Sequence, residues 1–98
     1  MFHIVWVFHA VPERLGEFAD AYGLDGGWVE LFREGAGYHD TELFQSQAEP
    51  SRFLTIDRWD SRRAYEEFRR ERRSDYARLD AACEALTVRE EFLGAFGE

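Results

Sequence analysis

Residues 52–68 read RFLTIDRWDSRRAYEEF, and this stretch decides the fold of the 98-residue chain. Its first half is rich in β-branched and aromatic residues and follows the turn-forming run QAEPS, which predicts a strand over 52–59. Asp60 or Ser61 then supplies a helix N-cap. The stretch therefore predicts a strand that leads directly into a helix, with Phe53, Thr55, Asp57 and Trp59 on one face of the strand.

The helical pattern continues for about 20 residues after this stretch. Apolar and aromatic side chains recur there every three or four positions, which predicts one continuous buried seam. The seam consists of Tyr65, Phe68, Arg72, Tyr76, Leu79, Cys83 and Leu86. Ser74 and Asp75 form a good internal N-cap pair, so we expect the helix to break there into two.

Similar patterns predict the remaining elements. Strands are expected over 2–9, 37–45 and 89–96, and helices over 12–22 and 26–34. The order βα(α)ββα(α)β predicts an α+β, ferredoxin-like βαββαβ fold, in which a four-stranded antiparallel sheet carries helices on one face. Ninety-eight residues allow one such domain, over 1–98.

The first strand is apolar on both faces. Phe2, Ile4, Trp6 and Phe8 share one face, whereas Val5 and Val7 lie with His3 and His9 on the other. Helices on one side leave the second apolar face bare. We therefore expect a homodimer in which two sheets pair face to face, because closed twofold dimers are the commonest homo-oligomers.

Composition argues against several classes of partner. The formal net charge is −8 and the eight Arg of residues 58–78 alternate with acids at helical spacing, so nucleic acid is not expected as a partner. Cys83 is the only cysteine, which argues against disulfides and fits a cytoplasmic location. No run approaches about 18 apolar residues, so no membrane span is expected.

Two segments resemble one known family. Residues 53–68, with Trp59, Ser61, Ala64 and Tyr65, are similar to the strand-to-helix signature of antibiotic biosynthesis monooxygenase-type domains. The run GAGY at 35–38 resembles that family's entry to its hairpin. The resemblance implies a dimeric α/β barrel. It also implies a relation to enzymes that oxidise phenols to quinones with molecular oxygen and neither metal nor flavin; other relatives cleave haem, act on small quinol-like signals, or have no known activity.

The resemblance carries over in part to individual residues. Trp59 and Tyr65 occupy the spacing of the pair that lines the substrate cavity in quinone-forming members. Those members place an amide four residues before the Trp, where this chain has Thr55. Haem-degrading relatives use an Asn and a helical His that are both missing here, so that reaction is not expected.

Six further residues are candidates for ligand binding or chemistry. Asp57 lies within a strand. A carboxyl there must be hydrogen-bonded or ion-paired, because otherwise its pKa rises. Asp57 would accept the proton of a phenol, or it would be a solvated or ion-paired surface residue. Tyr65 would donate a hydrogen bond to the ligand, and Arg72 would stabilise an oxyanion or pair with Asp57 or Asp75. Trp6 and Phe8 are candidate cavity walls, and His39 lies at the entry of the hairpin. Each of these side chains also has a purely structural interpretation, as core or surface.

The sequence thus leaves three functions open. The first is a monooxygenase that needs no cofactor and acts on a small aromatic phenol or quinol, because such a substrate supplies its own electrons once it is deprotonated. The second is a non-catalytic dimer that binds a small hydrophobic ligand. The third is a structural or interaction dimer whose helices fill the cavity.

Overall fold

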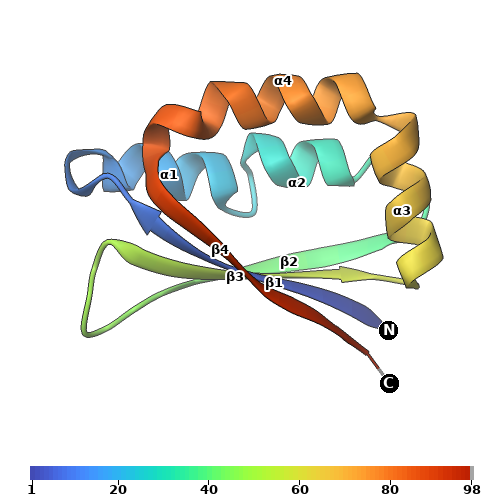
Figure 1. The fold of residues 1–98 in the computed structure, drawn as a ribbon, viewed down its shortest axis with the longest axis horizontal. Helices are drawn as coiled ribbons and strands as arrows, with labels where there is room; N and C mark the ends of the chain where they lie inside the picture. Colours follow the sequence, from blue (N-terminus) through green and yellow to red (C-terminus); the bar gives the residue numbers. More distant parts are fainter. Residues whose placement is uncertain (98) are drawn as a thin grey trace.

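The computed structural model describes residues 1–97 and shows a sheet with helices on one face (Figure 1). The elements are β1 (Phe2–Ala10), the 3₁₀ turn η1 (Pro12–Arg14), α1 (Leu15–Tyr22), α2 (Gly27–Phe32), β2 (Tyr38–Gln45), β3 (Arg52–Trp59), α3 (Arg62–Glu71), α4 (Arg73–Cys83), the 3₁₀ turn η2 (Glu84–Leu86) and β4 (Thr87–Gly97). The predicted ferredoxin-like α+β fold is confirmed. No helix of the described chain is both long and apolar enough to cross a bilayer.

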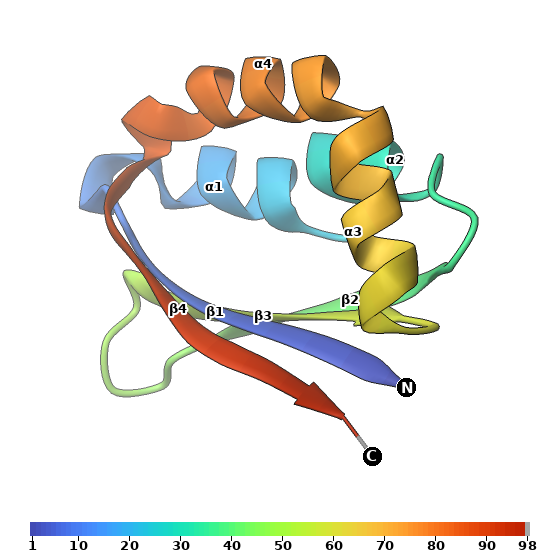
Figure 2. The same cartoon turned by 45° about the vertical axis from the view of Figure 1, so that its right-hand side comes forward.

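The sheet has the strand order β2-β3-β1-β4, and every neighbouring pair is antiparallel. β1 is therefore a central strand, as its apolar sequence predicts. In its register with β3, Phe2 lies opposite Trp59 and Ile4 opposite Asp57. Figure 2 shows β4 at the near edge of the sheet, below α3 and α4.

The core lies between the sheet and the helices. Alternate residues of β1 and β3 point into it and meet aromatic side chains from α1, α2 and α3. The buried apolar members include Phe2, Ile4, Phe8, Phe18, Trp28, Phe32, Phe53, Trp59 and Phe68. Burying a large apolar side chain contributes about 1.5–3 kcal/mol, so this layer is the main source of the free energy of folding.

The long helical stretch breaks earlier than predicted. Ser61 caps α3 by accepting a hydrogen bond from the Ala64 N–H at 3.1 Å, as expected. The break, however, falls at Arg72, whose backbone leaves the helical region at φ −112° and ψ 28°, and not at Ser74 and Asp75. Figure 2 shows α3 beside one end of the sheet and, after the corner, α4 running above α1 and α2.

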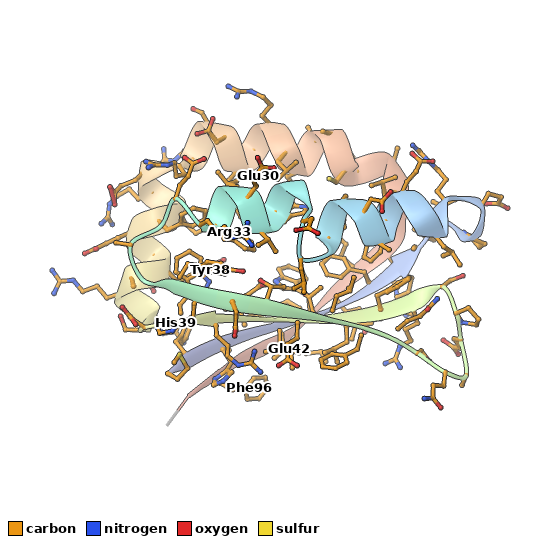
Figure 3. All side chains as sticks on the ribbon, turned by 180° about the vertical axis from the view of Figure 1, so that it is seen from behind. Glu30, Arg33, Tyr38, His39, Glu42 and Phe96 are labelled. Carbon is orange, nitrogen blue, oxygen red and sulfur yellow. The ribbon has the colours of Figure 1, made fainter. Side chains whose placement is uncertain are left out.

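The opposite face of the sheet carries no helix within one chain (Figure 1), although Val7, which lies on it opposite Leu54, is only 1% exposed. Antiparallel register places Val5, Leu54 and Ile56 on this outer face together with Phe44. Phe44 and Phe96 are 48% and 54% exposed. Figure 3 shows Glu42 and Phe96 on the side of the sheet away from the helices, whereas Tyr38 lies on the helix side. The face-to-face dimer therefore stays a prediction.

The loop before β2 packs directly on the turn from β3 to α3. A Cβ at Gly35 would lie 2.7 Å from the Trp59 ring, and a Cβ at Gly37 would lie 2.5 Å from Ala64 Cβ. Real Cβ atoms do not approach other atoms this closely, so both positions require glycine for steric reasons. Residues 35–37 thus pack closely against the end of β3 and the start of α3.

Candidate functional site

A cavity of about 250 Å³ lies between the inner face of the sheet and the helices. Seven of its lining residues are aromatic, and the polar ones come from β2, β3, α3, α4 and β4. The complete lining is Ile4, Trp6, Phe8, Tyr22, Trp28, Phe32, Thr41, Thr55, Asp57, Tyr65, Arg69, Tyr76, Asp80 and Glu90. Its volume is just below the usual range of about 300–1,000 Å³ for small-molecule sites, so it suits a compact ligand.

Asp57 is the buried acid of this cavity. Its place on the inner face of β3, opposite Ile4 of β1, leaves it only 7% exposed. Burial raises the pKa of Asp57 from its ordinary 3.8 to about 6, although a hydrogen bond from Thr41 acts in the opposite direction. A carboxyl with a pKa near 6 can accept and release a proton near neutral pH.

Two hydroxyl groups connect Asp57 to the edge of the sheet. Thr41 Oγ1 donates to Asp57 Oδ1 at 2.7 Å, and the Tyr38 hydroxyl lies 2.7 Å from Thr41 Oγ1. Because the Thr41 proton goes to the carboxyl, the Tyr38 hydroxyl serves as donor to Thr41. The chain Tyr38–Thr41–Asp57 fixes the carboxyl orientation within the cavity.

Tyr65 and Arg69 line the α3 wall. Arg69 Nη1 donates to the Tyr65 hydroxyl oxygen at 2.9 Å. The Arg69 guanidinium carbon also lies 3.8 Å from the centroid of the Tyr76 ring, at cation–π distance. Since the Tyr65 oxygen accepts from Arg69, its own O–H remains available to a ligand.

Two more carboxylates line the cavity from α4 and β4. Asp80 and Glu90 are both exposed side chains. Partial burial raises the pKa of Glu90, and the nearby Asp80 charge adds to this effect. With Asp57, the lining holds three acids and one base.

Five predicted site residues line this cavity. They are Trp6, Phe8, Thr55, Asp57 and Tyr65. Trp6 and Phe8 stack on each other with ring centroids 6.0 Å apart, and Thr55 is buried. The functional roles of these five residues remain predictions, but the structure brings their side chains together.

Trp59 does not form a cavity wall, contrary to the expectation. It is 0% exposed and packs behind Tyr65, against Phe32, Tyr38 and Phe68. Its indole N–H is buried and finds no hydrogen-bond partner among the described residues. Its contacts are those of a core residue.

His39 and Arg72 also lie outside the cavity. His39 lies at the irregularity between Tyr38 and Asp40 in the β2–β3 pairing. Its Nε2 is hydrogen-bonded to Asp60 Oδ1 at the surface. Arg72 lies at the helix break, where Nε donates to Glu34 Oε1 at 3.0 Å, so it pairs with neither Asp57 nor Asp75. Arg69, one turn earlier, is the arginine that reaches the cavity.

Sequence reasoning missed several lining residues. Thr41 is buried between the exposed Asp40 and the half-buried Glu42, and it could have been found from its inner-face register opposite Asp57. Arg69 carried no distinguishing signal, because it lies within a run of charged residues that predicts a solvated helix face. Across the described residues, no group of three or more His, Cys, Asp and Glu side chains is arranged to hold a metal ion.

Comparisons with known proteins agree with this architecture. The sequence profile described as antibiotic biosynthesis monooxygenase matches residues 1–78. A search of curated proteins returned no relative. Solved structures resemble the chain over nearly its whole length, at identities that show the fold alone.

Three of these structures illustrate the likeness. A candidate antibiotic biosynthesis monooxygenase from Nitrosomonas europaea has a TM-score of 0.76 and 13% identity, covering 100% of this chain and 98% of its own. A variant of SnoaB, a cofactor-independent oxygenase from Streptomyces nogalater, has a TM-score of 0.73 and 17% identity, covering 99% and 91%. PA3566 from Pseudomonas aeruginosa has a TM-score of 0.71 and 17% identity, covering 99% and 92%.

The profile match covers most of the chain, and it includes both segments that first suggested the resemblance, at 35–38 and 53–68. The fold, the strand order and the helix-covered cavity agree with the same assignment. The chain belongs to the antibiotic biosynthesis monooxygenase family.

Proposed function

We propose that this protein is a cofactor-independent monooxygenase that oxidises a small aromatic phenol or quinol. One observation carries the proposal: a buried carboxyl, Asp57, has its pKa raised to about 6 within a cavity in which half of the lining residues are aromatic. A group with this pKa is poised to take a proton from an acidic hydroxyl. The flat side chains of Trp6 and Phe8 suit a ring-shaped ligand beside it.

The reaction needs few protein groups. Asp57 accepts the phenolic proton, and the electron-rich phenolate then gives electrons to molecular oxygen. In the conversion of a phenol to a quinone, one oxygen atom becomes the new carbonyl, and the other leaves as water with the ring hydrogen and the hydroxyl hydrogen. The four electrons come from the substrate, so the protein has to orient, desolvate and accept a proton.

Other lining residues have matching roles in this proposal. The Tyr65 O–H donates to a substrate oxygen as negative charge develops on it. Thr55, buried on the same face of β3 as Asp57, offers a hydroxyl to the same substrate. A structurally similar protein supports this chemistry: SnoaB, which is 17% identical, is described as a cofactor-independent oxygenase.

Oxygen uptake by metal-free protein, measured across a panel of anthrone-like and quinol substrates, tests the proposal. Asp57→Asn should lower the rate at least about a hundredfold, because general-base catalysis contributes about 10²–10⁴-fold. Asp40→Asn, an exposed acid on the outer face, is the matched control and should leave the rate unchanged. Uptake by Asp57→Asn at the wild-type rate would remove Asp57 from the chemistry.

A non-catalytic ligand-binding dimer is the second candidate. Thr55 favours it, because a hydroxyl stands where quinone-forming relatives carry an amide. Ligand-induced quenching of tryptophan fluorescence without oxygen uptake on any substrate would support this function and contradict the first. The purely structural dimer requires helices that fill the interior, whereas the structure has a cavity of about 250 Å³.

We also propose that two chains pair through the outer sheet face. The support is the exposed apolar surface of Phe44 and Phe96, which extends the half-buried Val5, Leu54 and Ile56. Arg58, ion-paired with Asp40 and Glu42, borders this surface. An apolar centre with a charged rim is the usual anatomy of a protein–protein interface.

A further inference from the structure

We propose that Arg69 selects ligands that carry one anionic group, so that the substrate is a phenol with a carboxylate on its ring. The inference rests on the proposed function for the position of the phenol at Asp57. It adds a specificity-determining residue and a substrate class. The observations that carry it are the placement of the Arg69 side chain and the charges around the cavity.

The Arg69 guanidinium is held in place at the cavity wall. Its Nη1 donates to the Tyr65 hydroxyl at 2.9 Å, and its carbon lies 3.8 Å from the Tyr76 ring centroid and 5.8 Å from that of Tyr65. Guanidinium has five N–H donors in a fixed planar fork. Among the described residues only one of its hydrogen bonds to the protein is formed, which leaves donors for a ligand.

Four arginines of α3, α4 and the residue between them have a carboxylate partner. Arg62, Arg63, Arg72 and Arg78 each form an ion pair with a carboxylate. Arg69, Arg70 and Arg73 form none within the part of the chain that the structure describes. Of these three, Arg69 alone is among the described residues that line the cavity. A stacked arginine without a carboxylate partner at a cavity wall has the chemistry of an anion receptor.

The remaining charges of the cavity determine how an anionic ligand would lie. Asp57, Asp80 and Glu90 repel a carboxylate, whereas Arg69 is the base among the described lining residues that attracts it. The Tyr65 O–H adds a second donor at the same end. A carboxylate held there directs the hydroxyl end of the ligand toward Asp57, which accepts its proton.

The register of the strands indicates how far the Tyr65 ring is offset from Asp57 along β3. Tyr65 packs against Phe2 and Trp59, which lie opposite each other, with ring centroids 6.1 and 5.6 Å away. Asp57 lies one inner-face row further along β3, which is about 7 Å in the strand direction. One aromatic ring with a substituent at each end matches this offset and the compact volume of the cavity.

Binding of two ligands of the same shape tests the inference. The probes are 4-hydroxybenzoate and its neutral analogue 4-hydroxybenzamide, titrated without oxygen while tryptophan fluorescence is recorded. The wild type should bind the carboxylate about tenfold more tightly, which equals about 1.4 kcal/mol. Arg69→Gln should abolish this preference, and Arg69→Lys should keep part of it, because the charge remains while the planar fork is lost.

Arg70→Gln is the matched control. It removes the same charge from the neighbouring position, which does not line the cavity, and should preserve the preference. Equal binding of both probes by the wild type, binding of neither, or a preference retained in Arg69→Gln would overturn the inference. Thermal unfolding of each variant confirms that the chain is folded. A protein that shows the preference but consumes no oxygen would retain this inference and lose the oxygenase.

Discussion

The two faces of the sheet have similar apolar content but different surroundings. The inner face, covered by helices, buries Phe2, Ile4 and Trp59 almost completely. On the outer face, Phe44 and Phe96 keep about half of their surface exposed. The pattern of a strand therefore indicates which residues share a face, but the covering layer decides how far they are removed from water.

The polar groups of the two faces differ in the same way. Asp57 on the inner face is desolvated, and its pKa rises to about 6. On the outer face Arg58 forms ion pairs with Asp40 and Glu42 at the surface, where each pair contributes at most about 1 kcal/mol. One sheet thus carries a buried carboxyl on one side and an apolar surface bordered by ion pairs on the other.

The largest effect should come from removing an inner-face aromatic. Trp59→Ala should lower the free energy of unfolding by about 3–5 kcal/mol, because it leaves a cavity among Phe32, Tyr65 and Phe68. Chemical denaturation measures the loss. The outer-face control, Phe44→Ala, should cost about 1 kcal/mol in a single chain. An equal loss for both variants would mean that a partner covers the outer face as fully as the helices cover the inner one.

The stability of Asp57→Asn should increase relative to that of the wild type as the pH rises. The folded carboxyl keeps its proton up to about pH 6, whereas the unfolded one loses it near 3.8. The folded state binds more protons between these values, so wild-type stability falls across this window, by about 2–3 kcal/mol in total. Denaturant unfolding at pH 4 and pH 8 should show the variant gaining this difference, while Asp40→Asn should not. A difference in unfolding free energy between the wild type and Asp57→Asn that does not depend on pH would contradict the raised pKa.

Placing a charge on the outer face should disrupt the proposed dimer. Phe44→Glu should weaken self-association at least about tenfold, since a buried unpaired charge is costly at an interface. Sedimentation over a range of protein concentrations gives the dissociation constant. Leu24→Glu is the control, because Leu24 is 61% exposed in the segment between α1 and α2. A wild type that is monomeric at all concentrations would contradict the dimer.

The smallest effect concerns the hydrogen bond to Asp57. Thr41→Val keeps the shape of the side chain but removes the donor that lowers the pKa of the carboxyl. The pKa of Asp57 should then rise further, by about one unit or less. The pH at which stability falls, or at which oxygen uptake rises, should move upward accordingly. Glu42→Gln, the adjacent outer-face residue, should leave that pH unchanged.

Much of the fold follows from local pattern. The β2 and β3 strands, the Ser61 cap and the shared face of Thr55, Asp57 and Trp59 all agree with the sequence, because the period of a strand fixes the side on which each residue lies. That period does not determine how deeply each residue is buried. Trp59 lies on the expected face, but it is 0% exposed and packs against Phe68 of α3, so the period of the strand alone does not separate a wall residue from a core residue.

The arginines show a second reason why the site was only partly predictable. Arg72 fits the apolar seam if α3 and α4 form one helix, but the helical phase is interrupted at that residue and its side chain turns to Glu34. Arg69 lies before the break and keeps its phase, so it stays beside Tyr65 and Tyr76. The position of the break thus decides whether Arg72 follows the phase of α3, whereas Arg69 precedes both the predicted and the observed break.

The contact between Gly35 and Trp59 has a consequence for how this protein can change over generations. The two positions are 24 apart along the chain, but a Cβ on the first would lie 2.7 Å from the indole ring of the second. A side chain at position 35 requires a smaller ring at position 59 and a small shift of Phe68, which would lie 3.0 Å from the new Cβ. The smaller ring alone would leave a void. The two sites should therefore show strong epistasis, with each single substitution harmful and only a compensating pair retained. Substitutions in the segments 35–38 and 53–68 should therefore be coupled at positions 35 and 59.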